Sequence, residues 1–160
     1  MLSDHVDTIL SQWRVARPDL DCSAMGVVGR LRRTNNLWTD NMNEVFRAHG
    51  LSAIEFDILA TLRRSDVAEI TPTQLYQTLM LSSGAVSTKI EQLVKRGFVQ
   101  RVASEQDRRS CKVTLTEQGA TFIDAVLNEH VANMDNMLLA LDDKERDQLA
   151  DLLRKILLAK

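Results

Sequence analysis

The stretch that decides the fold is residues 71–115, which read TPTQLYQTLMLSSGAVSTKIEQLVKRGFVQRVASEQDRRSCKVTL. It opens on a capping-box pattern, with Thr71 as the expected N-cap, Pro72 as the first helical residue and Gln74 returning to the cap. These residues predict a short helix that runs to about Met80.

A second helix is predicted after a brief turn, with Ser82 or Ser83 as its N-cap. Gly97 is expected to end it, and Phe98 is placed for the hydrophobic contact that accompanies such an end. The apolar residues of this helix recur at i, i+4, i+7 and i+8 along one face, at Val86, Ile90, Leu93 and Val94.

Two segments typical of β-strands follow, residues 98–102 and 111–115, and the stretch between them is polar and charged. This pattern predicts a hairpin with a long tip. The order helix, turn, helix and hairpin is a winged helix-turn-helix. The expected fold class is therefore mainly α with a small β-hairpin wing (α+β).

Helical patterns flank this stretch on both sides. We expect helices over residues 3–16 and 23–49, and further helices starting at Ser52, Thr116 and Asp142. The chain thereby divides into helical regions 1–50 and 116–160 and a winged domain at 51–115.

Basic charge is concentrated in the winged segment. Residues 82–112 hold seven basic and three acidic residues, whereas the whole chain holds 20 basic and 22 acidic residues. A field that attracts phosphate would therefore be local to this segment. The 44% of hydrophobic and 26% of charged residues are typical of a globular protein.

The polar face of the second helix is a candidate surface for double-stranded DNA. A helical wheel places Thr88, Gln92 and Lys95 opposite the apolar face. Side chains of this kind reach base edges and phosphates in a major groove, and small residues in the first turn allow close approach of the helix end. The predicted DNA contacts on this helix are Ser83, Gly84, Ser87, Thr88, Lys89, Gln92 and Lys95. An ordinary amphipathic helix with a solvated polar face is the alternative.

The hairpin tip carries Asp107, Arg108 and Arg109. A tip arginine beside a helix in the major groove is well placed for the neighbouring minor groove, where negative potential is enhanced. We expect Arg108 and Arg109 to contact DNA and Asp107 to brace the loop. A solvated charged turn would explain the tripeptide alone, but not its order and spacing after the helix.

The chain gives no local sign of catalysis, a metal site or a membrane segment. Its three histidines are scattered, and no nucleophile elbow, phosphate loop or paired-histidine motif occurs. Cys22 and Cys111 lack disulfide-framework or zinc-site spacing, and no leader or membrane-spanning run is found. We expect a cytoplasmic protein that is not an enzyme and needs no cofactor.

The segment resembles the MarR family of bacterial transcriptional regulators. The match comprises residues 81–99, residues 107–110 and the sequence LTEQG at 115–119, in the order that the family has. The resemblance implies a homodimer formed by regions 1–50 and 116–160, which binds a pseudo-palindromic operator and responds to a small ligand or to oxidation. It also implies that Arg109 enters the minor groove.

Within this family the chain is similar to the PecS-type branch, some members of which respond to urate. The resemblance lies in Trp13 before the sequence RPDLD at 17–21, and in Asp57 and Arg64 seven residues apart. It implies that Trp13 stacks on a flat effector, Arg64 pairs with an anion and Asp57 accepts from ring nitrogens. Lys89, where the branch usually has arginine, would tie effector binding to the second helix. Candidate effectors are urate, another purine, or a phenolic or aromatic acid.

Three alternatives remain open from the sequence. Cys22, at a helix N-terminus, is a candidate oxidation sensor. The winged segment could instead bind an acidic protein partner. Trp13 could be a core anchor, and Asp57 with Arg64 a structural ion pair.

Overall fold

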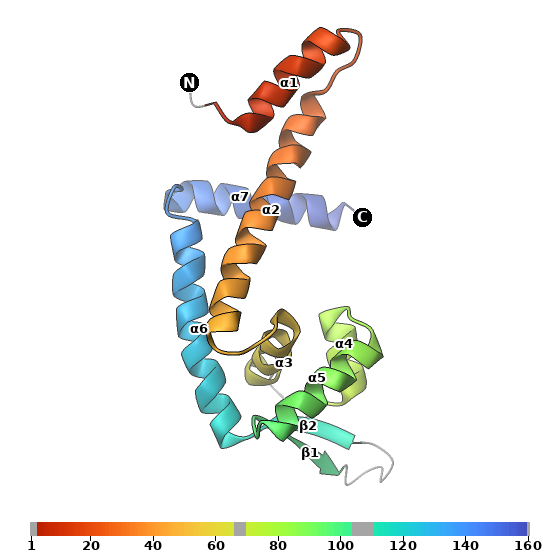
Figure 1. The fold of residues 1–160 in the computed structure, drawn as a ribbon, viewed down its shortest axis with the longest axis vertical. Helices are drawn as coiled ribbons and strands as arrows, with labels where there is room; N and C mark the ends of the chain where they lie inside the picture. The colour runs from red at the N-terminus through yellow and green to blue at the C-terminus, as the bar shows by residue number, and fades with distance from the viewer. Residues whose placement is uncertain (1–2, 66–69, 104–110, 160) are drawn as a thin grey trace. The chain divides into compact units, whose positions relative to one another are not determined.

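A computed structural model of the chain describes residues 3–65, 70–103 and 111–159 (Figure 1). The described ranges form seven helices and one two-stranded antiparallel sheet, as the expected fold class requires. The chain divides into two compact units, residues 1–41 and 42–160, and the boundary falls inside the second helix.

The first unit holds α1 (His5–Ala16) and most of α2 (Ser23–Ala48). Asp4 caps α1, so this helix begins two residues later than predicted. Ser23 is the first residue of α2, and the Asp21 carboxylate accepts from its backbone N–H at 2.9 Å. The two helices pack at Val6, which is 4% exposed and whose side chain lies against Gly29 of α2.

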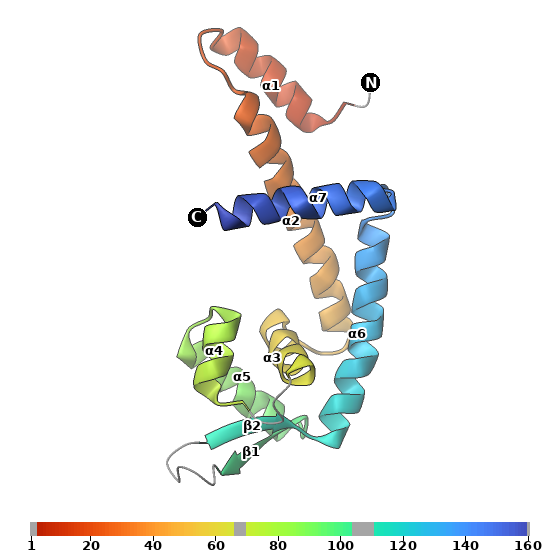
Figure 2. The same cartoon turned by 180° about the vertical axis from the view of Figure 1, so that it is seen from behind.

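The second unit contains the end of α2, the winged domain and the last two helices. Its further elements are α3 (Ala53–Arg64), α4 (Pro72–Leu79), α5 (Ser83–Lys95), β1 (Val99–Ala103), β2 (Cys111–Leu115), α6 (Glu117–Met137) and α7 (Asp143–Leu158). The hairpin, α3, α4 and α5 gather in one region, and α6 leads away from it (Figures 1 and 2).

The predicted caps in the winged domain are confirmed. Thr71 and Gln74 form the capping box of α4, and Ser82 caps α5. Met80 ends α4 in a left-handed conformation at φ 52°. Strand β1 begins one residue later than expected, because the Phe98 N–H donates to the Leu93 carbonyl and so closes α5.

The hairpin pairs Val99 with Leu115 and Ala103 with Cys111 at its two ends. Ile70 adds an isolated antiparallel bridge to Val113, through two backbone hydrogen bonds of 3.0 and 2.8 Å. This bridge fixes the chain before α4 to the hairpin, so the base of the wing and the helix-turn-helix share one core.

That core is continuous from the end of α2 to the middle of α6. Its fully buried members include Ile90 and Leu93 from the apolar face of α5, together with Val113 from the hairpin. Phe46 and Phe56 stack at a centroid distance of 4.2 Å. The predicted apolar face therefore holds α5 against the body of the domain.

The junction between α5 and α6 is unusually close. The Thr116 hydroxyl donates to the Gly97 carbonyl at 2.6 Å, and the Gly119 N–H donates to that hydroxyl at 2.9 Å. A Cβ on Gly119 would lie 1.9 Å from the Phe98 carbonyl oxygen, so glycine is required there.

Helix α7 contrasts with the core. All of its residues are described, and none of them is buried. Several large apolar side chains remain exposed on it, namely Leu152, Ile156, Leu157 and Leu158. Among the helices that the structure describes, none combines the length and apolarity needed to cross a membrane.

Candidate nucleic-acid interface

The N-terminal turn of α5 is open to a ligand. The Ser82 hydroxyl accepts from the Ala85 N–H at 3.4 Å, and Ser83 and Gly84 are exposed. A Cβ on Gly84 would meet nothing within 4 Å. Unpaired N–H groups at a helix N-terminus attract anions, so this turn suits a backbone phosphate.

The outward face of α5 is polar and exposed along its length. Ser87, Thr88, Gln92 and Lys95 all lie on the exposed surface. The Thr88 hydroxyl donates to the Gly84 carbonyl at 3.1 Å, which leaves its lone pairs and methyl group for an outside partner. Lys95 offers a flexible cation near the end of the helix.

Lys89 lies differently from the side chains on the outward face. It is half-buried, and its Nζ donates to Gln92 Oε1 at 2.9 Å. The same Nζ lies 3.7 Å from Glu55 Oε2. Lys89 is therefore held along the flank of α5 that faces the start of α3.

Glu55 is a residue that sequence analysis missed. It is only 6% exposed, and its Oε2 accepts from the Ser52 N–H at 2.8 Å and from the Ser52 hydroxyl at 2.6 Å. Burial raises the pKa of Glu55, but these bonds and the charges of Lys89 and Arg96 outweigh it, so the pKa lies below its usual range. The Ser52-x-x-Glu55 spacing is a capping box, which was the available signal.

Arg96 is the second cation at this carboxylate. Its Nη1 lies 3.9 Å from Glu55 Oε1 and donates to the Gly50 carbonyl at 2.9 Å. Its guanidinium also lies over the Phe98 ring, 4.9 Å from the centroid. Arg96 thus connects the end of α5 to the turn before α3, where Gly50 adopts φ +64°.

Sequence analysis assigned no contact to Glu91, an acidic residue on α5. Glu91 lies on the exposed surface, with Oε1 3.9 Å from Nη2 of Arg101 on β1. The pair connects α5 to β1 at the surface.

The wing tip residues Asp107, Arg108 and Arg109 lie outside the described residues. The two strands before and after them are described, and Ala103 and Cys111 form the last pair of the hairpin (Figure 2).

The predicted effector residues fall into both units. Asp57 and Arg64 both lie on α3 and are exposed. Desolvation raises the pKa of Asp57 above its usual range, and the charges of Arg64 and His130 only partly offset it. Trp13, 38% exposed, belongs to the unit of residues 1–41.

His130 is a further residue beside this group. It is 8% exposed, and its ring lies 4.7 Å from that of Phe56. Among the residues that the structure describes, none forms a hydrogen bond with its Nδ1. Burial lowers the pKa of His130, and Asp57 opposes that shift. Perturbed titratable groups of this kind are frequent at functional sites.

The two cysteines are free thiols. Cys22 is 8% exposed, which restricts the access of an oxidant to its sulfur. In the part of the chain that the structure describes, no group of three or more His, Cys, Asp and Glu side chains could hold a metal ion.

A helix with a polar outward face and an open N-terminal turn, followed by a two-stranded wing, defines a winged helix-turn-helix DNA-binding protein. Comparison with known proteins agrees with this class. The MarR family model matches residues 49–110. Over 153 residues the chain is 38% identical to the HTH-type transcriptional regulator PecS of Dickeya dadantii, with 95% of this chain and 92% of that protein covered.

Two further relatives are similar over shorter or more distant alignments. The transcriptional repressor MprA of Escherichia coli is 32% identical over 118 residues, 74% of this chain and 67% of that protein. A cysteine-to-serine variant of Escherichia coli MarR, solved with operator DNA, has a TM-score of 0.71 at 25% identity and covers 97% of this chain and 99% of that one. The chain belongs to the MarR family of transcriptional regulators.

Proposed function

We propose that the protein is a homodimeric repressor that binds a pseudo-palindromic operator and is released from it by a small aromatic or anionic effector. The observation that carries the proposal is the exposed polar face of α5, which a buried apolar face and an anchored flank hold in place. A rigid helix that presents short polar side chains suits sequence-specific contact in a major groove.

The proposed DNA contacts divide by chemistry. Ser83, Gly84 and Lys95 are suited to phosphates, whereas Ser87, Thr88 and Gln92 are suited to base edges. Lys89 contributes through its hold on Gln92, and Arg108 and Arg109 contact the minor groove while Asp107 braces the wing tip.

Dimerisation uses regions 1–50 and 116–160. The support for this proposal is the exposed apolar surface of α7, where Leu152 is 61% and Leu157 is 68% exposed. Large apolar side chains gathered on one helix mark an interaction surface, and a second copy of the chain offers the same surface in return.

The proposed effector site is formed by Asp57 and Arg64, with Lys89 linking it to α5. Trp13, in the unit of residues 1–41, is the residue proposed to stack on a flat effector. The raised pKa of Asp57 supports the proposal, because the carboxyl of this otherwise exposed residue is partly shielded from water and would gain from a ring N–H donor. Arg64 would pair with an acidic effector. Urate, another purine and phenolic or aromatic acids are the candidates.

The DNA contacts are tested on a duplex selected by the full chain from random sequences. Affinity should fall linearly in log salt, and Arg109→Ala should weaken binding and reduce the slope by about one. Arg63→Ala is the matched control, because Arg63 is an exposed arginine on α3 that pairs with Asp124 and is not among the proposed DNA contacts. Equal binding of selected and random duplexes at every salt concentration would rule out sequence-specific operator binding.

The effector site is tested by titrating the protein–operator complex with urate, xanthine and salicylate. Arg64→Ala should keep operator affinity but need at least about tenfold more effector for release, because a charge-assisted contact is lost. Arg63→Ala is the control, since Arg63 pairs with Asp124 of α6 at 2.7 Å. If Arg64→Ala shows the wild-type dose response, the site lies elsewhere.

A further inference from the structure

Lys89 has an unusual environment for a cation on a DNA-binding helix. Its Nζ lies between the Gln92 side-chain oxygen at 2.9 Å and the buried Glu55 carboxylate at 3.7 Å. The lysine side chain is 26% exposed, and that of Glu55 is 7% exposed. The ammonium group therefore faces the protein on one side and Gln92 on the other.

The Glu55 carboxylate fixes the position of this ammonium group. Glu55 is itself held by two hydrogen bonds from Ser52, the N-cap of α3. A buried carboxylate needs cations close by to remain charged, and Lys89 and Arg96 supply them. Lys89 is thus retained on the flank of α5 by the core of the domain.

The contact with Lys89 determines which end of the Gln92 amide faces inward. An ammonium group only donates, so only the amide oxygen of Gln92 can be its partner. The oxygen and the NH2 group are the two arms of one planar fork, so the direction of the oxygen also fixes the direction of the NH2 group. With the oxygen bound to Lys89, the NH2 group of this exposed residue is directed away from the lysine.

We propose that Glu55 and Lys89 are positioning residues that set the base preference of Gln92, because they turn its amide oxygen toward the protein and its NH2 group toward the major groove. This inference rests on the proposed role of α5 in base contact.

The base class follows from the donor pattern. A free glutamine amide binds adenine in a bidentate manner, because its oxygen accepts from N6 while its nitrogen donates to N7. With its oxygen turned toward Lys89 on the flank of α5, the amide does not face its oxygen and nitrogen together to adenine, so the adenine N6 donor opposes the glutamine NH2 group. Guanine N7 and O6, and thymine O4, offer acceptors and match the fixed amide.

The experiment selects duplexes of random sequence with the full-length wild type, Gln92→Ala, Lys89→Met, Lys89→Arg and Glu55→Gln. The position where Gln92→Ala loses base preference identifies the base that Gln92 contacts. The wild type should select guanine or thymine there. Lys89→Met should free the amide oxygen and reduce discrimination against adenine by roughly fivefold to a hundredfold, the range for a bidentate base contact.

The remaining variants separate positioning from mere stability. Lys89→Arg still donates and should keep the wild-type preference. Glu55→Gln lacks the charge that holds Lys89, and its discrimination should fall between the wild type and Lys89→Met. Arg96 still neutralises Glu55 in Lys89→Met, so thermal unfolding should show a folded protein. A purely structural lysine would lower affinity for all duplexes alike.

The outcomes distinguish the two proposals. Selection of adenine by the wild type at the Gln92 position, no change on Gln92→Ala, or an unchanged preference in Lys89→Met would each overturn the role of Lys89. An unchanged preference in Glu55→Gln would overturn the role of Glu55. If the wild type enriches no sequence, the proposed operator binding fails, and the base preference fails with it.

Discussion

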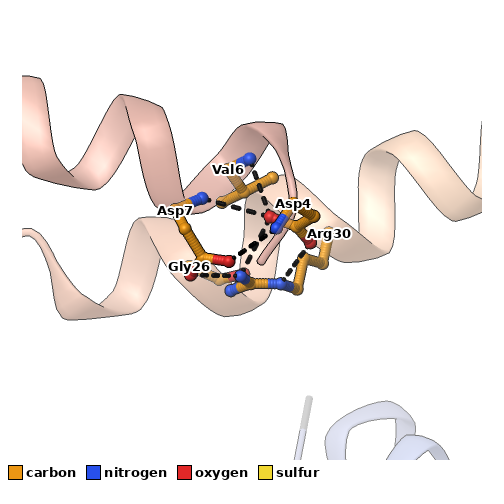
Figure 3. A network of polar contacts seen from close by, with 5 residues as sticks. All are labelled: Asp4, Val6, Asp7, Gly26 and Arg30. Atoms are coloured by element: carbon orange, nitrogen blue, oxygen red, sulfur yellow. Dashed lines mark hydrogen bonds and ion pairs between the residues drawn. The ribbon is translucent and has the colours of Figure 1, made fainter. Parts of the chain in front are cut away.

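The starts of α1 and α3 are built from the same motif but lie in different surroundings. At α1, Asp4 and Asp7 form a capping box, and Arg30 of α2 donates to Asp4 at 2.8 Å and to Asp7 at 2.7 Å (Figure 3). At α3, Ser52 and Glu55 form the capping box, and the cations are Lys89 of α5 and Arg96 at the C-cap of that helix. In both, an acid at the third helical position binds its own cap and a cation distant in sequence.

The two networks differ in their exposure to water. The side chains of Asp4, Asp7 and Arg30 are between 42% and 51% exposed, whereas that of Glu55 is 7% exposed. Water and salt screen the first network, so its ion pairs add little to stability. The second network holds a charge inside the domain, where loss of any partner is costly. Burial, and not the number of hydrogen bonds, determines how much each network contributes to the stability of the fold.

The largest effect is expected for Glu55→Ala. This change removes the cap acceptor of α3 and leaves two half-buried cations without their carboxylate, which should lower the free energy of unfolding by about 2–4 kcal/mol. Urea denaturation would measure it. Glu91→Ala is the control, since Glu91 is exposed and pairs with Arg101 only at 3.9 Å. Equal losses for the two variants would show that burial of Glu55 is unimportant.

A smaller effect on the free energy of unfolding is expected when the pH is lowered. Because the pKa of Glu55 is lowered in the folded protein, its contribution is fully present above the ordinary glutamate pKa and is lost as pH falls through the lowered value. Urea denaturation at pH values from about 6 down to about 3 should show a shallower loss of stability for Glu55→Gln than for the wild type, since ordinary glutamate titrates near pH 4. If stability fell with pH equally steeply in the wild type and in Glu55→Gln, Glu55 would not contribute to the acid sensitivity of the fold.

The smallest effect is expected for Arg30→Gln. Arg30 lowers the pKa of both Asp4 and Asp7, but all three groups are in contact with solvent. The capping box of α1 remains without the guanidinium, so the melting temperature should hardly change, and less still at high salt. A loss as large as that of Glu55→Ala would mean that the exposed network stabilises the fold.

Local signals predicted most of the fold. The caps at Thr71, Ser82 and Thr116 each use a side chain and the next few backbone N–H groups, so sequence spacing is sufficient to find them. The apolar face of α5 likewise repeats with the helical period. These features depend on neighbours within one or two turns.

The contacts around Lys89 could not be predicted in the same way. The capping box at Ser52 predicts that Glu55 bonds to its own helix start, but not that α5 brings Lys89 and Arg96 to the same carboxylate. That meeting depends on how the core packs α3 against α5. The candidate effector residues have the same difficulty, since Trp13 and Asp57 are 44 positions apart and belong to different units.

The close contact at Gly119 has a mechanical consequence. With the start of α6 packed against the Phe98 carbonyl, and the Thr116 hydroxyl bonded to the Gly97 carbonyl, no compressible side chain separates the two helix ends. A change in the tilt of α6 would therefore displace the end of α5 and the first residue of the wing. The orientation of α6 and the position of α5 are therefore mechanically coupled through this contact.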